Sequence, residues 1–572
     1  MSFRFAIIGS GLTGTSMLYQ FVRLLEHEAR SGALDPICTH ILVFEKRPVA
    51  GPGFPHNPEF VKPYHITNMC AGEMSVSFSQ PQDFSDWIES RRADLEYCFP
   101  ILKTFMHDPS YHHYDCSHYP RALMGEYLKA RFRDAVTIAE KIGIKVEVHT
   151  ECEVINIEEN DRGLMVFARD RAHSYISRFA TDRLLLSTGH WPRKGSGRRY
   201  CASPWPANRL LEKIPAGSVV GVIGSSLSAI ETVLTLSSDG RFTRDEWGRL
   251  IFKAPPKPRR ISMLSRHGLL PSVRNHFASY QPRSFNQENL RELLDTQFQN
   301  LTLDTIFRLL DQELRLANGQ PHNWKLFLSP NISPMDILSA ELEQSSIAPV
   351  YPCSALWQTI LRQAFPVIRE LYLALSPVER KRFNKEYATY FFAHAASQPR
   401  INAEKILALM RAELLEVVTL GHAYELSERK SGSGYRFTFG ENKSKVMNFP
   451  YIVDARGQEQ SLRANSSQLI RNLLGKNLFL LGSSNQSNSV QSELAATEDY
   501  ESGIINTGSI WIDPKSHHIM QVKGGVIQRS DSIYAVGAMT RGQIIDVSMA
   551  RGLTRSTHRI ATNLVKWLCR KS

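Results

Sequence analysis

Apolar runs and helical patterns alternate from the first residues of the chain. Residues 2–9 and 40–45 are short, nearly continuous apolar runs, which is typical of strands buried on both faces. Between them, residues 12–28 carry apolar side chains at helical spacing. A second strand–turn–helix unit is expected at 218–237, and its next strand at 260–264. This order predicts an α/β fold with parallel sheets.

The middle of the chain is mostly helical in pattern. Helices are expected at residues 290–310, 354–375, 377–393 and 402–415, with Pro/Ser stretches interrupting them between 329 and 353. One of these helices carries an apolar stripe at helical spacing, formed by Trp357, Leu361, Phe365, Ile368 and Leu371. A buried core explains such a stripe more simply than a binding groove does.

The patterns divide the chain into four regions. Residues 1–200 would form the first part of one domain, and residues 201–283 a second domain. Residues 284–420 would be a helical insertion and the region that determines substrate specificity. Residues 421–572 would return to both domains, with 458–507 as a further insertion. The remaining expected elements are helices at 119–141 and 551–568 and strands at 144–157, 163–168, 182–187, 437–454, 509–513 and 532–537.

Composition is ordinary for a globular protein, but the charge is not. The chain has 572 residues, 42% of them hydrophobic, and a formal net charge of +12. A basic surface attracts nucleic acid, anionic lipid or acidic small molecules. No nucleic-acid-binding module is evident in the sequence, so phosphate-rich cofactors and an anionic substrate explain part of the excess more simply.

Cysteine usage and hydropathy bear on the cellular compartment. The eight cysteines form no Cys-x-x-Cys pair, and without a secretory signal they indicate free thiols in a reducing cytoplasm. No apolar run reaches the roughly 18 residues of a membrane span. We therefore expect a cytoplasmic protein.

A glycine-rich turn follows the first strand. In Gly9-x-Gly11-x-x-Gly14, the first glycine permits a tight turn, the second lets a pyrophosphate approach, and the third lets the helix pack on the sheet. The amides that begin the helix then face the phosphates. Glu45 ends the next strand, where its carboxylate can bind both ribose hydroxyls. The predicted contacts of this first dinucleotide site are Gly9, Gly11, Leu12, Thr13, Gly14, Glu45 and Lys46.

A second, degenerate version of the motif begins at Gly224. Serine and alanine replace its second and third glycines, and the predicted contacts are Gly224, Ser225, Ser226 and Ser228. The next strand ends in Ser265 and Arg266 rather than in an acid. A carboxylate there would repel a 2′-phosphate, whereas serine and arginine would bind one. The first site therefore suits FAD or NAD, and the second suits NADP, unless Arg266 is only a solvated surface residue.

Further segments resemble a known family. Residues 51–54 with 65–69, 119–128, 182–190 and 533–542 resemble motifs of the FAD/NAD(P)-binding flavoproteins related to the amino-acid N-hydroxylating monooxygenases. The resemblance implies a fold with two Rossmann-like domains, one for FAD and one for NADP, and a mostly helical insertion. It adds Asn68, Met69, Arg121, Thr188, Gly189, His190, Gly537, Thr540 and Arg541 to the expected cofactor contacts.

The resemblance also implies a reaction. NADPH would reduce FAD, a C4a-hydroperoxyflavin would form with O2, and an amine or amino acid would become a hydroxylamine. Asn68 is a candidate for a polar contact near the flavin, or else a turn residue that caps its own backbone. An amino-acid substrate would need a carboxylate clamp, for which Arg274, Arg400 and Arg541 are candidates. Related enzymes often form dimers or tetramers, so a homo-oligomer is an open expectation.

Departures from the family pattern leave other functions open. Ala455-Arg456-Gly457 stands where a Thr-Gly-Pro-like turn is common, and Ala393-His394-Ala395-Ala396 replaces a His/Arg-rich stretch. One alternative is a flavin reductase or dehydrogenase that passes electrons to a protein, a quinone or a small acceptor. Another is a flavin-binding protein without turnover.

A histidine-rich stretch raises the question of a metal. It contains His107, His112, His113, Cys116 and His118. Their spacing matches no compact zinc motif, so a loop near the cofactor is the simpler interpretation and no metal is expected.

Overall fold

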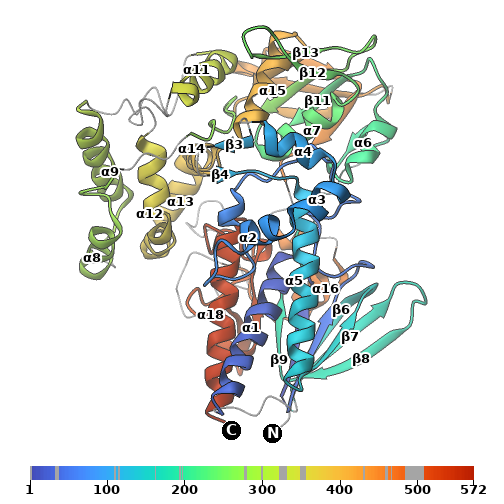
Figure 1. Ribbon diagram of the computed structural model, residues 1–572, viewed down its shortest axis with the longest axis vertical. Coiled ribbons are helices and arrows are strands. Elements are labelled where there is room, and N and C mark those ends of the chain that lie inside the picture. Colours follow the sequence, from blue (N-terminus) through green and yellow to red (C-terminus); the bar gives the residue numbers. More distant parts are fainter. Residues whose placement is uncertain are drawn as a thin grey trace.

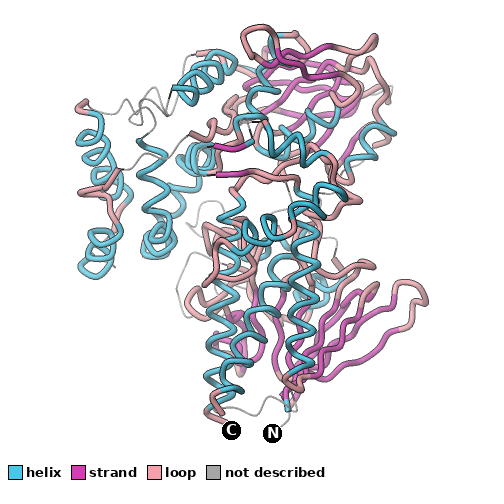
Figure 2. Tube along the Cα trace, in the orientation of Figure 1, coloured by secondary structure: helices cyan, strands magenta, loops and turns pink. Residues whose placement is uncertain are grey.

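The structure is a computed structural model of the chain. It describes residues 3–32, 38–108, 111–113, 116–161, 163–191, 193, 195, 197–275, 280–297, 301–320, 332–347, 356–429, 432–457, 461–464, 467–482 and 508–571. Two parallel sheets and a separate group of helices account for most of it (Figures 1 and 2).

The first sheet contains both ends of the chain. Its six strands lie in the order β20-β21-β9-β1-β2-β5. They are β1 (Phe3–Ile8), β2 (Thr39–Phe44), β5 (Lys145–His149), β9 (Arg183–Leu186), β20 (His518–Lys523) and β21 (Val526–Ala535). β1 pairs in parallel with β2 and β9, and β20 alone runs antiparallel to its neighbour. The predicted apolar runs are buried on both faces, as parallel strands require.

Three long helices cover one face of this sheet. They are α1 (Leu12–Arg30), α5 (Arg121–Lys141) and α18 (Ala550–Cys569), and Figure 1 shows them side by side with both termini at one end. Buried polar contacts fix α1 against α18: the hydroxyls of Ser16 and Thr557 lie 2.8 Å apart, and Gln20 donates to the Thr554 carbonyl. The C-terminal helix is therefore part of the first domain.

Smaller elements cover the opposite face. β6 (Cys152–Asn160), β7 (Gly163–Asp170) and β8 (Ile176–Thr181) form an antiparallel sheet that packs with α16 (Gln468–Gly475). The single strand expected at 144–157 is two strands, β5 and β6, because Glu151 adopts a left-handed backbone conformation between them. Of the insertion expected at 458–507, residues 458–460, 465–466 and 483–507 lie outside the described residues.

The second sheet is parallel throughout. Its order is β10-β19-β11-β14-β15, with β10 (Tyr200–Cys201), β11 (Val219–Ile223), β14 (Arg260–Ser265), β15 (Leu415–Thr419) and β19 (Tyr451–Asp454). Helices α7 (Leu227–Leu236) and α15 (Arg400–Arg411) pack on one face. On the other face lie the antiparallel strands β16 (Glu425–Glu428), β17 (Tyr435–Phe439) and β18 (Lys445–Phe449).

Strand β15 corrects one expectation. The helix expected at 402–415 ends at Arg411, and Leu415 begins a strand that pairs with β14. Glu413 ends the helix, because its φ of +56° is outside the helical region. A β-branched pair, Val417 and Val418, then favours the strand.

The helical region has a core of its own. It comprises α8 (Gln287–Gln297), α9 (Leu303–Asn318), α12 (Leu356–Ala374), α13 (Pro377–Arg382), a π-helical turn (Phe383–Tyr387) and α14 (Ala388–Ala395). Figure 1 shows α8, α9 and α12 beside the two sheets. The single helix expected at 290–310 is two helices, because the Thr302 hydroxyl accepts the amide of Thr305 and caps a new start. Within the stretch expected to interrupt the helices, α11 (Pro334–Ile347) is helical and packs on α15.

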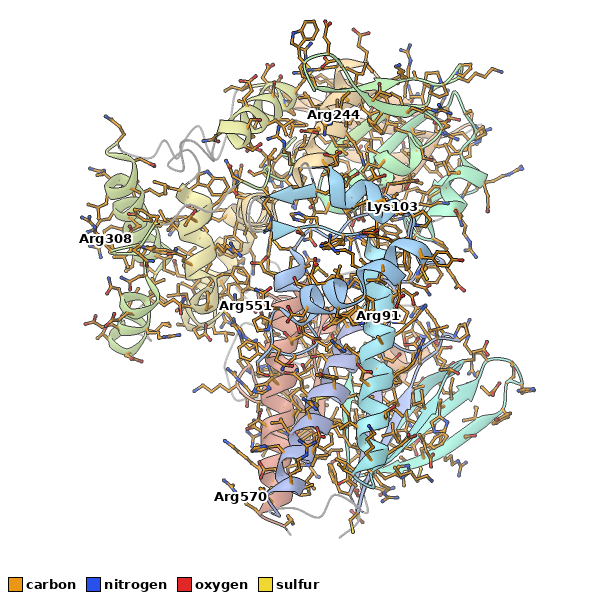
Figure 3. All side chains as sticks on the ribbon, in the orientation of Figure 1. Arg91, Lys103, Arg244, Arg308, Arg551 and Arg570 are labelled. Atoms are coloured by element: carbon orange, nitrogen blue, oxygen red, sulfur yellow. The ribbon has the colours of Figure 1, made fainter. Side chains whose placement is uncertain are left out.

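The fold class expected from the sequence is confirmed: two parallel-sheet units with a mostly helical insertion. No helix among the described residues combines the length and apolarity that crossing a bilayer requires. The free thiols expected are confirmed for Cys38, Cys98, Cys152, Cys201 and Cys569. The expectation is wrong for Cys70, which is disulfide-bonded. Figure 3 shows labelled basic residues from Arg244 at one end of the molecule to Arg570 at the other.

Candidate dinucleotide sites

The turn between β1 and α1 leaves no room for side chains at two of its glycines. A Cβ on Gly9, whose φ is +97°, would lie 2.5 Å from the Ser187 carbonyl oxygen. A Cβ on Gly14 would lie 2.0 Å from the carbonyl oxygen of Gly9. The turn is therefore tight against β9, and α1 packs closely on the sheet. No acidic residue occupies the first turn of α1.

A second glycine loop lies against this turn. A Cβ on Gly53 would approach the Gly11 Cα to 2.9 Å, and a Cβ on Gly51 would meet the Lys129 backbone at 2.9 Å. The Gly51 amide donates to the Ser10 hydroxyl at 3.3 Å. Residues 51–54 therefore lie next to the amides that begin α1, as the family resemblance implied.

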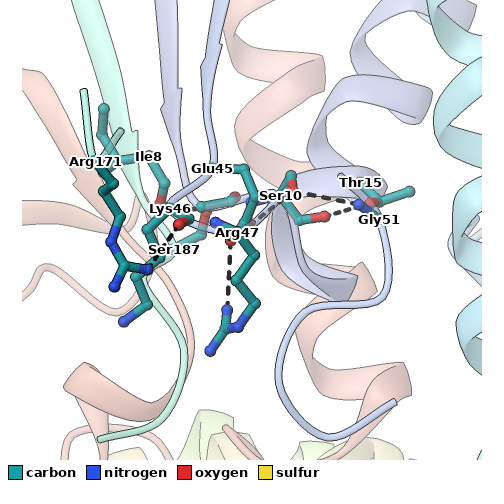
Figure 4. Close-up of polar contacts among 10 residues, drawn as sticks. Ile8, Ser10, Thr15, Glu45, Lys46, Arg47, Gly51, Arg171 and Ser187 are labelled. Atoms are coloured by element: carbon teal, nitrogen blue, oxygen red, sulfur yellow. Dashed lines mark hydrogen bonds and ion pairs between the residues drawn. The ribbon is translucent and has the colours of Figure 1, made fainter. Parts of the chain in front are cut away.

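Glu45 is buried beside the same turn (Figure 4). One carboxylate oxygen accepts the Ser10 amide at 3.1 Å and the Ser10 hydroxyl at 2.8 Å, and the other accepts the Arg47 amide at 3.0 Å. The Arg47 Nη1 donates to the second oxygen as well, at 3.4 Å. The carboxylate thus has about the four partners that it can accept, and a ribose hydroxyl would take the place of this longest contact. Burial and the nearby Arg47 charge lower the pKa of Lys46.

The turns that follow β9 and β21 also lie beside the first glycine turn. The Ser187 hydroxyl donates to the carbonyls of Ile8 and Gly9, which places residues 188–190 beside the glycine turn. The Cβ position of Gly537 lies 3.7 Å from the Thr13 hydroxyl, and the Thr540 hydroxyl donates to the Gly537 carbonyl at 2.8 Å. Three chain segments far apart in sequence thus meet at one sheet edge.

Polar groups at this edge lack protein partners. The Thr188 hydroxyl and the Arg193 Nε are buried without a hydrogen bond. Although Arg541 is partly exposed, desolvation and the nearby charge of Arg193 lower its pKa. Two adjacent cations, uncapped helix amides and a glycine turn fit an anionic dinucleotide. The residues present at the first site therefore fit FAD.

The loop expected to pass over the flavin is attached to the start of the helical region. Arg274 is buried and donates to the Asn68 carbonyl at 3.1 Å, with the Glu73 carboxylate 3.7 Å away. The Thr67 hydroxyl donates to the Met69 carbonyl at 2.9 Å. Arg274 therefore positions the backbone of this loop.

Arg400 and Arg121, both expected from the sequence to contact a ligand, bind carboxylates of the protein instead. Arg400 donates to Glu404 at 2.9 Å and to Ser345 at 2.8 Å, which ties α15 to α11. Arg121 donates through Nε to Glu231 at 2.5 Å, which joins α5 of the first unit to α7 of the second. Burial raises the pKa of Glu231 despite the opposing effect of Arg121. Because it is paired with Glu231, Arg121 connects the two units rather than being free to bind a cofactor.

The second glycine turn lies at the corresponding edge of the second sheet. Gly224 has a φ of +112°, and its Cβ position lies 3.2 Å from the Ala455 carbonyl oxygen. The Ser225 hydroxyl donates to the Leu269 carbonyl at 2.5 Å, while Ser226 precedes α7, whose first turn has no acidic residue. The backbone carbonyl of Ser228 accepts a hydrogen bond from the Thr232 hydroxyl one turn later in α7.

The end of β14 carries the groups expected to select a 2′-phosphate. The Ser265 hydroxyl accepts the Gly268 amide at 3.0 Å, and the next residue, Arg266, is exposed. His267 follows and lies beside Tyr390 and His422, with ring centroids 5.3 and 5.0 Å away. No carboxylate ends this strand, so the residues fit NADP better than NAD.

Sequence reasoning did not identify Asp454 as part of this edge. Arg456 donates to both oxygens of its carboxylate, at 3.0 and 2.6 Å, and contacts the Tyr424 hydroxyl at 3.3 Å. Arg456, which departs from the family turn, therefore forms a charged pair with Asp454 beside Gly224. The acid at the end of a buried strand was the signal that could have indicated it.

The histidine-rich stretch shows no metal geometry in the part that is described. The side chains of His107, His112, His113 and Cys116 lie outside the described residues, and His118 is buried. Among the described side chains, no group of three His, Cys, Asp or Glu could hold a metal ion.

Comparison with known proteins agrees with this geometry. Residues 6–191 match a family model described as FAD-NAD(P)-binding. This segment is therefore similar to FAD-NAD(P)-binding domains. The resemblance and cofactor class expected from the sequence are thereby confirmed for the first unit.

Relatives of the whole chain are distant. An uncharacterized protein of Escherichia coli, YdhS, is 23% identical over 475 residues, which cover 80% of this chain and 83% of the relative. An ornithine hydroxylase of Pseudomonas aeruginosa has a TM-score of 0.50 at 14% identity, over 99% of both chains. A cadaverine monooxygenase of Erwinia amylovora bound to FAD has a TM-score of 0.51 at 11% identity, over 98% of this chain and 95% of the other. The chain shares their fold, which together with the FAD-NAD(P)-binding domain supports an oxidoreductase.

Proposed function

We propose that this protein is an FAD-dependent, NADPH-using monooxygenase that N-hydroxylates an amine. The observation that carries the proposal is the pair of glycine turns at the edges of two parallel sheets, with the two units joined by Arg121 and Glu231. Hydride transfer from a nicotinamide to a flavin requires two dinucleotides bound close together, and a pair of connected sites provides this. The fold shared with an ornithine hydroxylase and a cadaverine monooxygenase favours an amine as the group that is oxidised.

The residues of the first site would hold FAD through distinct contacts. The amides that begin α1 and the cations Arg193 and Arg541 would neutralise its phosphates, and Glu45 would bind a ribose hydroxyl. The buried Thr188 hydroxyl would gain the partner that the protein does not provide. When bound, the flavin supplies the redox and oxygen chemistry.

The second site would hold NADPH. The amides at the start of α7 would face its pyrophosphate, while Ser265 and Arg266 would bind the 2′-phosphate. A second contact between the units helps to keep the two sites in register. Nε2 of the buried His65 lies 2.9 Å from the Thr235 hydroxyl of α7.

The net reaction balances with one O2 and one NADPH per amine. R–NH2, O2, NADPH and H⁺ give R–NHOH, NADP⁺ and H2O. The nitrogen must be neutral to react, so the protein has to bind the amine where a proton is disfavoured. A pocket closed to water also limits release of hydrogen peroxide.

The test is to measure NADPH consumption, hydroxylamine and hydrogen peroxide together, with a panel of amines and amino acids. The proposal predicts that a preferred amine yields hydroxylamine in proportion to NADPH consumed. NADPH consumption that yields only peroxide, or that depends on an added quinone, would favour the reductase alternative. A protein that binds flavin but is not reduced by NADPH would be a binding protein.

A further inference from the structure

The helical region lines a partly open apolar cavity of about 130 Å³. Its walls come from α9, α12, the π-helical turn and α14. Figure 1 shows α9, α12 and α14 in the same helical region. Leu310, Trp357, Leu361, Leu371 and Phe391 are among the side chains that line it. The stripe expected to be simple core therefore borders an open space, since four of its five residues are in the wall.

The wall of the cavity contacts the segments that follow both dinucleotide sites in the chain. On one side Ile545 lines it, four residues beyond Arg541, and the Tyr372 hydroxyl donates to the Gly542 carbonyl at 3.2 Å. On the other side Tyr390 lines it and lies beside His267, which directly follows Arg266. A pocket whose wall contacts both of these segments is a candidate place for a substrate that reacts near the flavin.

The lining indicates what it would hold. None of the described lining residues is Asp, Glu, Lys or Arg, and their polar groups are tyrosine hydroxyls, the Trp357 indole and His394. The His394 ring shares a hydrogen bond of 2.6 Å with Ser272. A free amino acid would bury an unpaired carboxylate here, which is strongly unfavourable. The arginines considered as a carboxylate clamp, Arg274, Arg400 and Arg541, are absent from this lining.

We propose that this cavity binds the apolar tail of the amine substrate, so that the substrate is an arylalkyl or alkyl amine rather than an amino acid. The inference rests on the proposed function and specifies its substrate class. An apolar cavity of about 150 Å³ binds benzene, so the tail corresponds to one aromatic ring or a chain of about six carbons.

The test measures binding separately from turnover, by calorimetry on the flavin-loaded protein. The probes are ethylamine, butylamine, hexylamine, benzylamine, ornithine and lysine. We expect affinity to rise about fourfold per added methylene until the cavity is filled. Benzylamine and hexylamine should bind with a negative heat-capacity change, and the two amino acids should bind at least tenfold more weakly.

Variants of the wall locate the binding. Leu361→Trp fills the cavity and should weaken hexylamine binding more than tenfold, whereas Phe391→Ala should move the optimum to longer tails. Leu309→Trp is the matched control, because Leu309 is a half-buried helical leucine of the same core that does not line the cavity. If Leu361→Trp does not fold, Ile368→Phe adds less volume to the same wall.

The outcomes separate the two claims. Equal binding of lysine and hexylamine, or equal effects of the tryptophan variants at positions 361 and 309, would overturn the substrate class while leaving the monooxygenase proposal intact. Binding of an apolar quinone in place of amines would overturn it as well. Tail-dependent amine binding without hydroxylamine formation would support the cavity but contradict the proposed function.

Discussion

The buried pair between Arg121 and Glu231 gives a quantitative prediction about the joint between the two units. The two side chains are only 16% and 4% exposed, and they connect α5 to α7. Removing one partner of a buried pair typically costs about 3–5 kcal/mol, because the other charge is left uncompensated. Since Arg121 keeps some solvent contact, we expect Glu231→Leu to lower the free energy of unfolding by about 3 kcal/mol.

The companion variant, Arg121→Met, adds a pH signature. Burial already raises the pKa of Glu231, and losing the arginine raises it further. A carboxyl whose pKa is higher folded than unfolded stabilises the fold below its unfolded pKa and loses that contribution as the pH rises. Wild-type Glu231 shares this slope until the pH passes its own folded pKa, which is already raised. Above that pH, Arg121→Met should continue to lose about 1.4 kcal/mol per pH unit relative to wild type, because its Glu231 ionises later.

A double-mutant cycle isolates the pair. The double variant Arg121→Met/Glu231→Leu should recover most of the loss, with a coupling energy of about 2 kcal/mol in urea denaturation. Asp83→Leu is the control, because it breaks a similarly buried pair with Arg131 within the first unit. When Asp83→Leu is combined with Arg121→Met, the losses in unfolding free energy of the two single variants should add to within about 0.5 kcal/mol. If the Arg121 and Glu231 variants are additive, the two side chains do not stabilise each other across the joint.

Three further predictions address the cofactor sites and acid sensitivity. Gly14→Ala should abolish flavin retention on gel filtration, because its Cβ would lie 2.0 Å from a carbonyl oxygen, whereas Gly475→Ala, with open space around it, should retain flavin. Arg266→Ala should raise the Kd for NADPH about tenfold or more by titration and leave that for NADH unchanged, while Arg260→Ala, at the other end of β14, should change neither. Burial lowers the pKa of His65 to about 3. Below about pH 6.5 the His65 ring is therefore protonated in the unfolded chain but stays neutral in the folded protein. Stability should therefore fall by about 1.4 kcal/mol per unit as the pH drops from about 6.5 toward 3, and less steeply in His65→Gln.

The first glycine turn could be predicted from the sequence because local sterics determine it. Gly9 and Gly14 are required by contacts within one strand–turn–helix unit, and the strand–helix pattern around them is regular. The same holds for Glu45, whose place at a strand end follows from that pattern.

Features that depend on tertiary contacts could not be predicted in this way. Leu415 begins a strand only because β14 offers it a pairing edge. Arg121 pairs with Glu231 across the two units, which no local pattern reports. The stripe through Leu361 has the same periodicity whether it faces packed side chains or a cavity.

The most direct test of two dinucleotide sites held together is an anaerobic titration of the flavin-reconstituted protein with NADPH. We expect the protein to retain FAD through gel filtration and NADPH to bleach the flavin absorbance at one equivalent, with NADH far less effective. A protein that retains no flavin, or whose flavin stays oxidised with NADPH bound, would contradict this expectation.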